Sequence, residues 1–165
     1  MLKNFLAGLV LAGAASLVAA DELPSSAPLF AATLSDMNDK PVALERFRGK
    51  PLIVNFWARW CGPCRQEIPD LIRVRGAHKG KLEVIGIGIE DKPESVREFA
   101  QAYDMDYPVL LAKEQGIPLM LALGNSKAGL PFTVAIDRHG RMVALRMGVM
   151  KKADFDAAAE AILKP

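Results

Sequence analysis

The sequence predicts an α/β domain in which helices cover both faces of one central sheet. Two short runs, LIVNFW at 52–57 and KLEVIGIGI at 81–89, are mostly apolar, as is typical of strands buried on both faces. Stretches with helical spacing alternate with these strand-like runs. The chain has 165 residues, of which 51% are hydrophobic, so it can form one well-buried core and is not wholly disordered.

Each element has its own signal in the sequence. Branched and aromatic residues mark the strands, apolar residues three or four positions apart mark the helices, and clusters of Gly, Pro, Asn and Asp mark the turns. The helix that follows the second buried run is expected to begin at a cap on Asp91. The expected elements are two weak strands within 30–44 around a turn at 36–40, a strand at 52–57, a helix at 62–77, a strand at 81–89, a helix carrying Val96 to Tyr103, a strand at 107–111, a short helix at 114–123, a hairpin of strands at 132–136 and 142–147, and a closing helix at 152–163.

The first twenty residues have the pattern of an export signal. Lys3 precedes an uninterrupted run of apolar or small residues from Phe5 to Leu17, and small residues lead up to the acidic Asp21. The simplest cleavage point is after Ala20, and an uncleaved membrane anchor is the alternative. The sequence therefore predicts a signal peptide at 1–20, a polar Pro/Ser-rich linker at 21–28 and a single domain at 29–165.

Charge and cysteine content exclude several classes of function. The formal net charge of +2 is too small, and too evenly spread along the sequence, to indicate a nucleic-acid-binding surface. Two cysteines cannot frame a disulfide-rich miniprotein, and two alone cannot close a structural zinc site. After export, both cysteines would face an oxidising compartment.

The motif that carries chemistry is Trp60-Cys61-Gly62-Pro63-Cys64, which lies where the first buried strand leads into a helix. Unpaired N–H groups and the helix dipole at that point stabilise a thiolate on Cys61. Cys64 lies one turn further along, within reach of Cys61, so the two can form an exchangeable disulfide across a very short loop. Half of a metal site or an inert bridge are the alternatives for a lone CxxC.

The residues around this motif are similar to those of the TlpA/ResA/DsbE-like group of thioredoxin-fold proteins. The segments that resemble the group are VNFWARWCGPC with the following Glu-Ile-Pro, Arg46 to Pro51, and Gly129 to Thr133 with Ala135-Ile136-Asp137 and Gly140. The resemblance extends over nearly all of 28–163. It implies a thioredoxin-like fold, a mixed sheet flanked by helices, with an N-terminal strand extension and a helix-strand insertion at 90–113.

Function also follows from the resemblance. Members of the group are mostly exported bacterial thiol–disulfide oxidoreductases that donate electrons, and several serve cytochrome c maturation. The resemblance implies a monomeric periplasmic reductase of protein disulfides. Because that compartment oxidises thiols, such a reductase needs a reduced partner, and a membrane electron donor is expected. It implies no cofactor and no metal, because the Cys61–Cys64 disulfide is itself the redox-active group, and nucleic acid is not an expected partner.

The resemblance also assigns roles to individual residues. Pro131 matches the cis-proline that lies beside the cysteines in this group, and the backbone of Leu130 before it would pair with the substrate chain. Glu67 matches a glutamate that several members place near the cysteine pair. It lies three residues after Cys64 on the same side of the helix, so it can accept the proton of Cys64 if it is partly buried; a solvated helix glutamate is the alternative. Asn55 departs from the buried aspartate of cytosolic thioredoxins. Trp60 is expected to be exposed and to line the substrate groove with Gly62 and Pro63.

Two other functions use the same cysteines. The first reverses the direction of exchange and makes the protein an oxidase or isomerase. The second is a copper chaperone in which Cys61, Cys64 and either His78 or His139 bind Cu(I).

Overall fold

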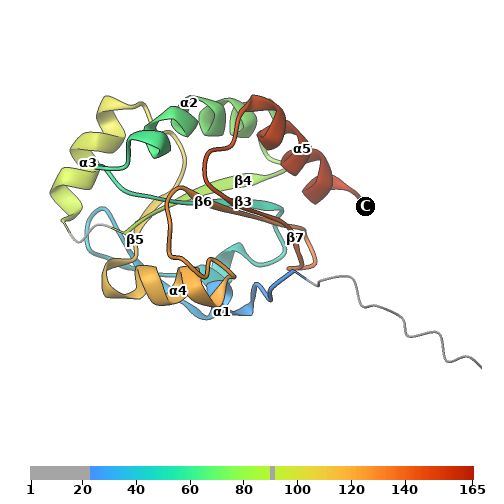
Figure 1. The fold of residues 1–165 in the computed structure, drawn as a ribbon, viewed down its shortest axis with the longest axis horizontal. Helices are drawn as coiled ribbons and strands as arrows, with labels where there is room; N and C mark the ends of the chain where they lie inside the picture. The colour runs from blue at the N-terminus through green and yellow to red at the C-terminus, as the bar shows by residue number, and fades with distance from the viewer. Residues whose placement is uncertain (1–22, 90–91) are drawn as a thin grey trace, which may run out of the picture.

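The computed structural model describes residues 23–89 and 92–165, which form a seven-stranded sheet with helices on both faces (Figure 1). The strand order is β2-β1-β5-β4-β3-β6-β7. The strands are β1 (Thr33–Asp36), β2 (Pro41–Ala43), β3 (Leu52–Trp57), β4 (Glu83–Gly88), β5 (Val109–Leu111), β6 (Phe132–Ile136) and β7 (Met142–Met147). The helices are α1 (Ala27–Ala31), α2 (Gly62–Ala77), α3 (Pro93–Ala102), α4 (Gly116–Ala122) and α5 (Lys152–Leu163), with short 3-10 turns at Leu44–Phe47 and Lys113–Gln115.

The sheet is mixed, as the family resemblance implies. Strands β3, β4 and β5 run parallel, whereas β6 pairs antiparallel with β3, and β7 with β6. The N-terminal hairpin β1–β2 extends the sheet beyond β5, and α3 with β5 forms the predicted helix-strand insertion. Because β3 is central and parallel to β4, the chain leaves its carboxyl end in the middle of one sheet edge, where ligands of open α/β sheets bind.

Alternation along β3 divides the core into two layers. Leu52, Val54 and Phe56 pack on the face covered by α1 and α4, whereas Ile53 and Trp57 pack on the face covered by α2, α3 and α5 (Figure 1). The same alternation places the Asn55 side chain beneath α2, in an otherwise apolar layer. A polar side chain at that depth requires hydrogen-bond partners, and the site described below supplies them.

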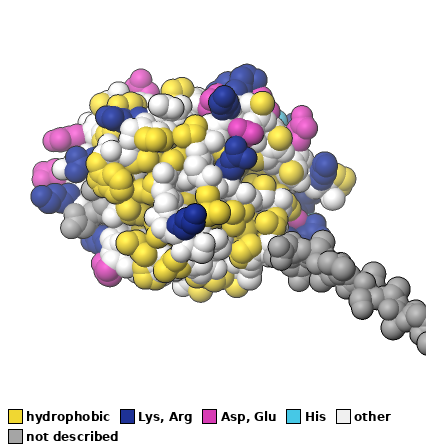
Figure 2. Space-filling model, in the orientation of Figure 1, with side chains coloured by type: hydrophobic (Ala, Val, Ile, Leu, Met, Phe, Trp, Pro, Cys, Tyr) yellow, Lys and Arg dark blue, Asp and Glu magenta, His cyan; other side chains and the backbone are white. Residues whose placement is uncertain are grey.

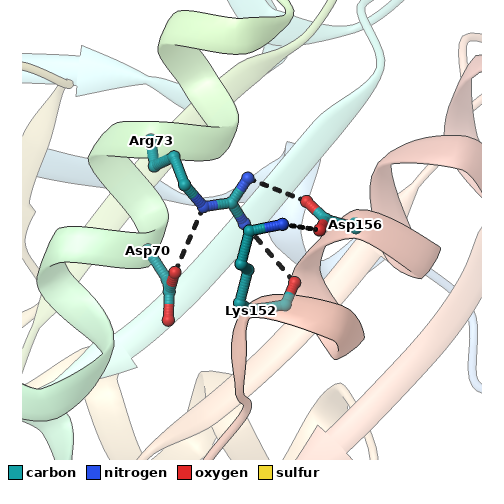
Figure 3. Close-up of polar contacts among 4 residues, drawn as sticks. All are labelled: Asp70, Arg73, Lys152 and Asp156. Atoms are coloured by element: carbon teal, nitrogen blue, oxygen red, sulfur yellow. Dashed lines mark hydrogen bonds and ion pairs between the residues drawn. The ribbon is translucent and has the colours of Figure 1, made fainter.

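Polar contacts join α2 to α5 on the face that these two helices cover (Figure 3). Arg73 of α2 bonds Asp156 of α5 at 2.8 Å and Asp70 of its own helix at 3.2 Å, and it also donates to the carbonyl of Lys152. Lys152 completes the group through its ammonium, 2.7 Å from Asp156. These side chains are partly exposed, so the network orients two helices whose attachment comes mainly from the apolar layer beneath.

Most element boundaries agree with the sequence-based predictions, and the differences are local. The second buried strand is shorter than predicted, because β4 covers only Glu83–Gly88. A short helix, α1, begins at Ala27 within the predicted linker. The proposed cap on Asp91 and the predicted signal peptide lie outside the described residues, and Lys92 directly precedes α3. Within the described ranges, no helix is both long and apolar enough to cross a membrane.

Candidate active site

Cys61 caps the N-terminus of α2. Its Sγ atom accepts a hydrogen bond from the backbone N–H of Cys64 at 3.2 Å, and the two cysteines are joined in a disulfide. Gly62 and Pro63 form the first turn between them, where a missing proline N–H costs nothing. When the disulfide is reduced, this hydrogen bond and the positive end of the helix dipole stabilise a thiolate on Cys61.

The two sulfurs differ in depth, and the surface beside them is apolar. Cys64 is 1% exposed and Cys61 5% exposed, while the neighbouring Trp60 is 71% exposed. Figure 2 shows hydrophobic side chains gathered on the face where Figure 1 draws the start of α2. Cys61 is therefore the sulfur that a partner reaches first, and Trp60 offers that partner an exposed aromatic surface.

The loop before β6 ends at the same edge of the sheet. Phe132 pairs with Phe56, so Pro131 lies level with Trp57, just before the chain turns towards Cys61. The Leu130–Pro131 peptide bond is cis, as expected. Pro131 is buried and its carbonyl accepts a hydrogen bond from the Gly148 N–H.

A buried asparagine holds this loop. The Asn125 side chain donates to the carbonyl of Gly129 at 2.7 Å and accepts from the N–H of Gly129 at 3.3 Å. Leu130 follows directly and is half-buried, and its backbone makes no hydrogen bond with the described residues. The loop thus presents a fixed stretch of backbone with free hydrogen-bonding groups beside the cysteine pair.

Glu67 is buried one turn beyond Cys64 on α2. Its carboxylate accepts hydrogen bonds from the Met150 N–H at 2.6 Å and from Nδ2 of Asn55 at 2.9 Å. Burial raises the pKa of Glu67 from 4.5 to about 7, and the two hydrogen bonds limit the rise because they stabilise the charged form. A carboxyl group with a pKa near neutrality can both take up and release a proton under physiological conditions.

Asn55 connects Glu67 to the sheet. Its Nδ2 also donates to Oγ1 of Thr133 at 3.0 Å, and Thr133 is the residue opposite Asn55 in the β3–β6 register. Both groups are buried. Because Asn55 does not ionise, Glu67 is the titratable group of this buried network.

Comparison with known proteins agrees with this geometry. A family model described as Redoxin matches residues 20–162. The chain belongs to the Redoxin family. The thiol-disulfide oxidoreductase ResA of Bacillus cereus is similar to it, with 29% identity over 143 residues that span 86% of this chain and 79% of ResA. The thioredoxin-like protein YneN of Bacillus subtilis is 28% identical over 127 residues, which span 75% of this chain and 72% of YneN.

A solved structure is also similar to this redoxin. A thiol:disulfide interchange protein from Chlorobium tepidum TLS aligns with a TM-score of 0.73 and 28% identity, covering 88% of this chain and 99% of the other. The redoxin therefore has the thioredoxin-like fold and is of the TlpA/ResA/DsbE type. Its Redoxin domain and its joined Cys61–Cys64 pair make it a thiol-disulfide oxidoreductase.

The redoxin's site contains residues that sequence reasoning missed. Thr133 and the backbone N–H of Met150 complete the surroundings of Glu67, and Asn125 fixes the loop that ends at Pro131. Thr133 carried a signal, because it is the one polar residue in an apolar strand. Asn125 and Met150 carried none, because a hydrogen bond within a loop and a contact made by a backbone group leave no pattern in the sequence.

The two histidines of the redoxin lie away from the sulfurs. His78 ends α2, whose 16 residues put it about 24 Å from Cys61. His139 lies in the β6–β7 turn, beyond the Ile136–Leu52 pair and so at the opposite end of β3. The copper chaperone, which needs a histidine beside the cysteines, does not fit this arrangement. Among the described residues no three His, Cys, Asp or Glu side chains are grouped as metal ligands.

Proposed function

We propose that this redoxin is an exported, periplasmic reductase of protein disulfides. The observation that carries the proposal is the position of Cys61, which caps a helix beside exposed Trp60, with Cys64 and Glu67 buried behind it. A nucleophile that is the more exposed of the two sulfur-bearing residues, and a resolving thiol beside a proton acceptor, are the parts that exchange requires.

The reaction begins with the reduced protein. The Cys61 thiolate attacks one sulfur of a substrate disulfide, and the other substrate sulfur leaves as a thiolate that takes a proton from solvent. The Cys64 thiol then loses its proton and attacks Sγ of Cys61, which releases the second substrate sulfur. Two electrons pass to the substrate, which becomes a dithiol, and the Cys61–Cys64 disulfide forms. The second step is intramolecular and gains from the high effective concentration of Cys64.

Glu67 is the proposed acceptor for the proton of Cys64. The carboxyl lies three residues after Cys64 and therefore on the same side of the helix. Its pKa of about 7 means that a large share of the molecules hold it ionised, and ready to accept a proton, at neutral pH. As it takes up the proton, the charge buried between Asn55 and Met150 disappears, which offsets the cost of forming a thiolate nearby.

Substrate recognition is proposed to use the backbone of Leu130. An extended substrate chain can pair with the free N–H and C=O groups of Leu130 as an added strand, while Trp60, Gly62, Pro63 and Pro131 form the surface beneath it. Main-chain pairing has little sequence preference, so the substrate class is exported proteins with an accessible disulfide. Apocytochrome c is a candidate, in keeping with the cytochrome c role of several members of the group.

Export and regeneration complete the proposal. A leader at residues 1–20 would deliver the domain at 29–165, joined by the segment 21–28, to a compartment that oxidises thiols. A reductase working there needs continual re-reduction of its Cys61–Cys64 disulfide, so we assign it a membrane electron donor. The exported domain is proposed to act as a monomer.

The test is a trapping experiment in the native compartment. Cys64→Ser should accumulate mixed disulfides through Cys61, and Cys61→Ser, the matched control, should accumulate none. Trapping through Cys64 instead would reverse the assigned roles. The purified wild-type protein, supplied with dithiothreitol, should reduce insulin, and a reduction potential well above that of glutathione with poor insulin reduction would instead identify an oxidase or isomerase.

A further inference from the structure

Cations from three separate segments gather at the end of the molecule opposite the cysteines. Two adjoining hollows at this end share Gly49, Pro51 and Lys81, and basic side chains line both of them. Arg141 lines a third hollow beside the β6–β7 turn, and Arg48 reaches the same turn at Gly140. We call this region the basic pole; its cations are Arg48, Lys50, Arg75, Lys79, Lys81, Arg138 and Arg141.

The basic pole has more positive charge than its carboxylates neutralise. Its seven cations face four carboxylates, each already in an ion pair: Glu45 with Arg48, Glu83 and Asp106 with Arg75, and Asp137 with Arg141. The excess of three positive charges exceeds the formal net charge of +2 of the entire chain. The sequence does not reveal this concentration of positive charge, because the cations lie far apart along the chain.

The remaining cations of the pole are free to meet an external anion. Lys50, Lys79, Lys81 and Arg138 are exposed and form no ion pair with the described residues. They surround hollows rather than a flat surface, and the one between Lys50, Lys79 and Lys81 has a volume of about 470 Å³. A hollow of this size rimmed by cations can take a compact anionic group such as a phosphate with its substituents.

The described chain also starts at this pole. Leu23 to Ser26 line the third hollow together with Gly140 and Arg141, and the Ser26 hydroxyl donates to the Gly140 carbonyl. Figure 1 shows the first described residues beside the β6–β7 turn, at the opposite end from the start of α2. The 22 residues that precede them include the apolar run FLAGLVLAGAASL.

We propose that the basic pole docks on an anionic phospholipid surface, with lipid phosphates in the hollows around Lys81. Two observations point to this occupant: uncompensated cations attract anionic headgroups, and the described part of the chain begins at the same pole. A lysine or arginine close to an anionic bilayer contributes roughly 1 kcal/mol, so the lysines of the pole suffice for reversible docking. Docking in this way leaves Cys61 at the other end of α2, a helix about 24 Å long, and so away from the docked pole.

Vesicle flotation tests the proposal. The full chain is expressed, and the protein is purified in the form that the cell exports. It is then mixed with vesicles of phosphatidylcholine alone or with added phosphatidylglycerol, at low and high salt. Binding should be stronger to the anionic vesicles and should fall with salt. The triple variant Lys50→Gln, Lys79→Gln and Lys81→Gln should bind the anionic vesicles on the order of a hundredfold more weakly.

The matched control removes the same charge elsewhere. Lys40→Gln, Lys92→Gln and Lys127→Gln together lower the net charge equally, at exposed positions outside the pole, and should change binding little. Thermal unfolding of both triple variants verifies their folds. Equal binding to neutral and anionic vesicles, or equal loss in the two triple variants, would overturn the proposal. Lysine-dependent binding to poly-glutamate without binding to anionic vesicles would also overturn it, and would identify an acidic protein as the partner instead.

Discussion

Replacing Glu67 with glutamine should make the stability of this redoxin less sensitive to pH. The substitution keeps the shape of the side chain and removes only its ionisation. The oxygen of the new side-chain amide can still accept from the Met150 N–H. The amide nitrogen would face Nδ2 of Asn55, and a flip of the Asn55 amide restores both contacts, because the Thr133 hydroxyl can donate as well as accept. The cost of this rearrangement does not depend on pH.

The magnitude follows from the pKa of Glu67 in the two states. In the unfolded chain the carboxyl ionises near 4.5, and in the folded protein near 7. Below pH 4.5 both states hold the proton, so burial of the carboxyl has no ionic cost. As the pH rises from 4.5 to 7 the unfolded state loses its proton first, and the folded state loses stability. At about 1.4 kcal/mol per pH unit, the full loss above pH 7 is at most about 3 kcal/mol.

The assay is urea unfolding of the oxidised wild type and of Glu67→Gln, followed by circular dichroism, from below pH 4.5 to above pH 7. Other groups titrate in both proteins, so the informative quantity is the difference between their unfolding free energies. That difference should move in favour of Glu67→Gln by about 3 kcal/mol across the range. Glu160→Gln, which alters an exposed carboxyl of α5, is the control and should show no such trend.

A difference that stays constant with pH would refute the reasoning, because Glu67 would then ionise alike in the folded and unfolded states. A difference that moves in favour of the wild type would show that the hydrogen bonds from Met150 and Asn55 outweigh burial.

Other substitutions test the parts around the site. Asn125→Ala should lower the efficiency of insulin reduction mainly through KM, because the loop that carries Leu130 loses both side-chain bonds to Gly129; an unchanged KM would contradict that role. Gly86→Ala should destabilise the fold by about 1–3 kcal/mol in urea unfolding, because the added Cβ would lie 3.0 Å from the Tyr107 ring; wild-type stability would show that the ring can move. Arg73→Ala should cost no more than about 1 kcal/mol, since its ion pairs are partly exposed; a larger loss in the same assay would mean that the α2–α5 contact depends on them.

The central elements were predictable because their signals are local. The run LIVNFW became β3 at the predicted boundaries, and the helix after the CGPC motif became α2 over Gly62–Ala77. In both cases the residues whose pattern predicts the element all lie within that element. The short helix α1 was missed because a helix of little more than one turn, Ala27–Ala31, is held by contacts with the rest of the fold, and a Pro/Ser-rich segment does not indicate it.

The sequence could place Glu67 near the cysteines but could not reveal its environment. Helical spacing puts Glu67 on the side of Cys64, yet its complete burial depends on Asn55, Thr133 and Met150, which come from three other segments. Such a site forms only when distant segments pack together, and no local pattern encodes it. The basic pole could not be predicted from the sequence for the same reason, because its cations come from segments that are distant along the chain.

The nucleophile, the resolving sulfur and the carboxyl all belong to seven consecutive residues, from Cys61 to Glu67, so this segment could be grafted into another scaffold of the same fold. A recipient should gain the exchange chemistry of the sulfurs from the helix start alone. It should not gain a carboxyl group with a pKa near neutrality, because the residues from other segments that bury Glu67 would not be transferred with it.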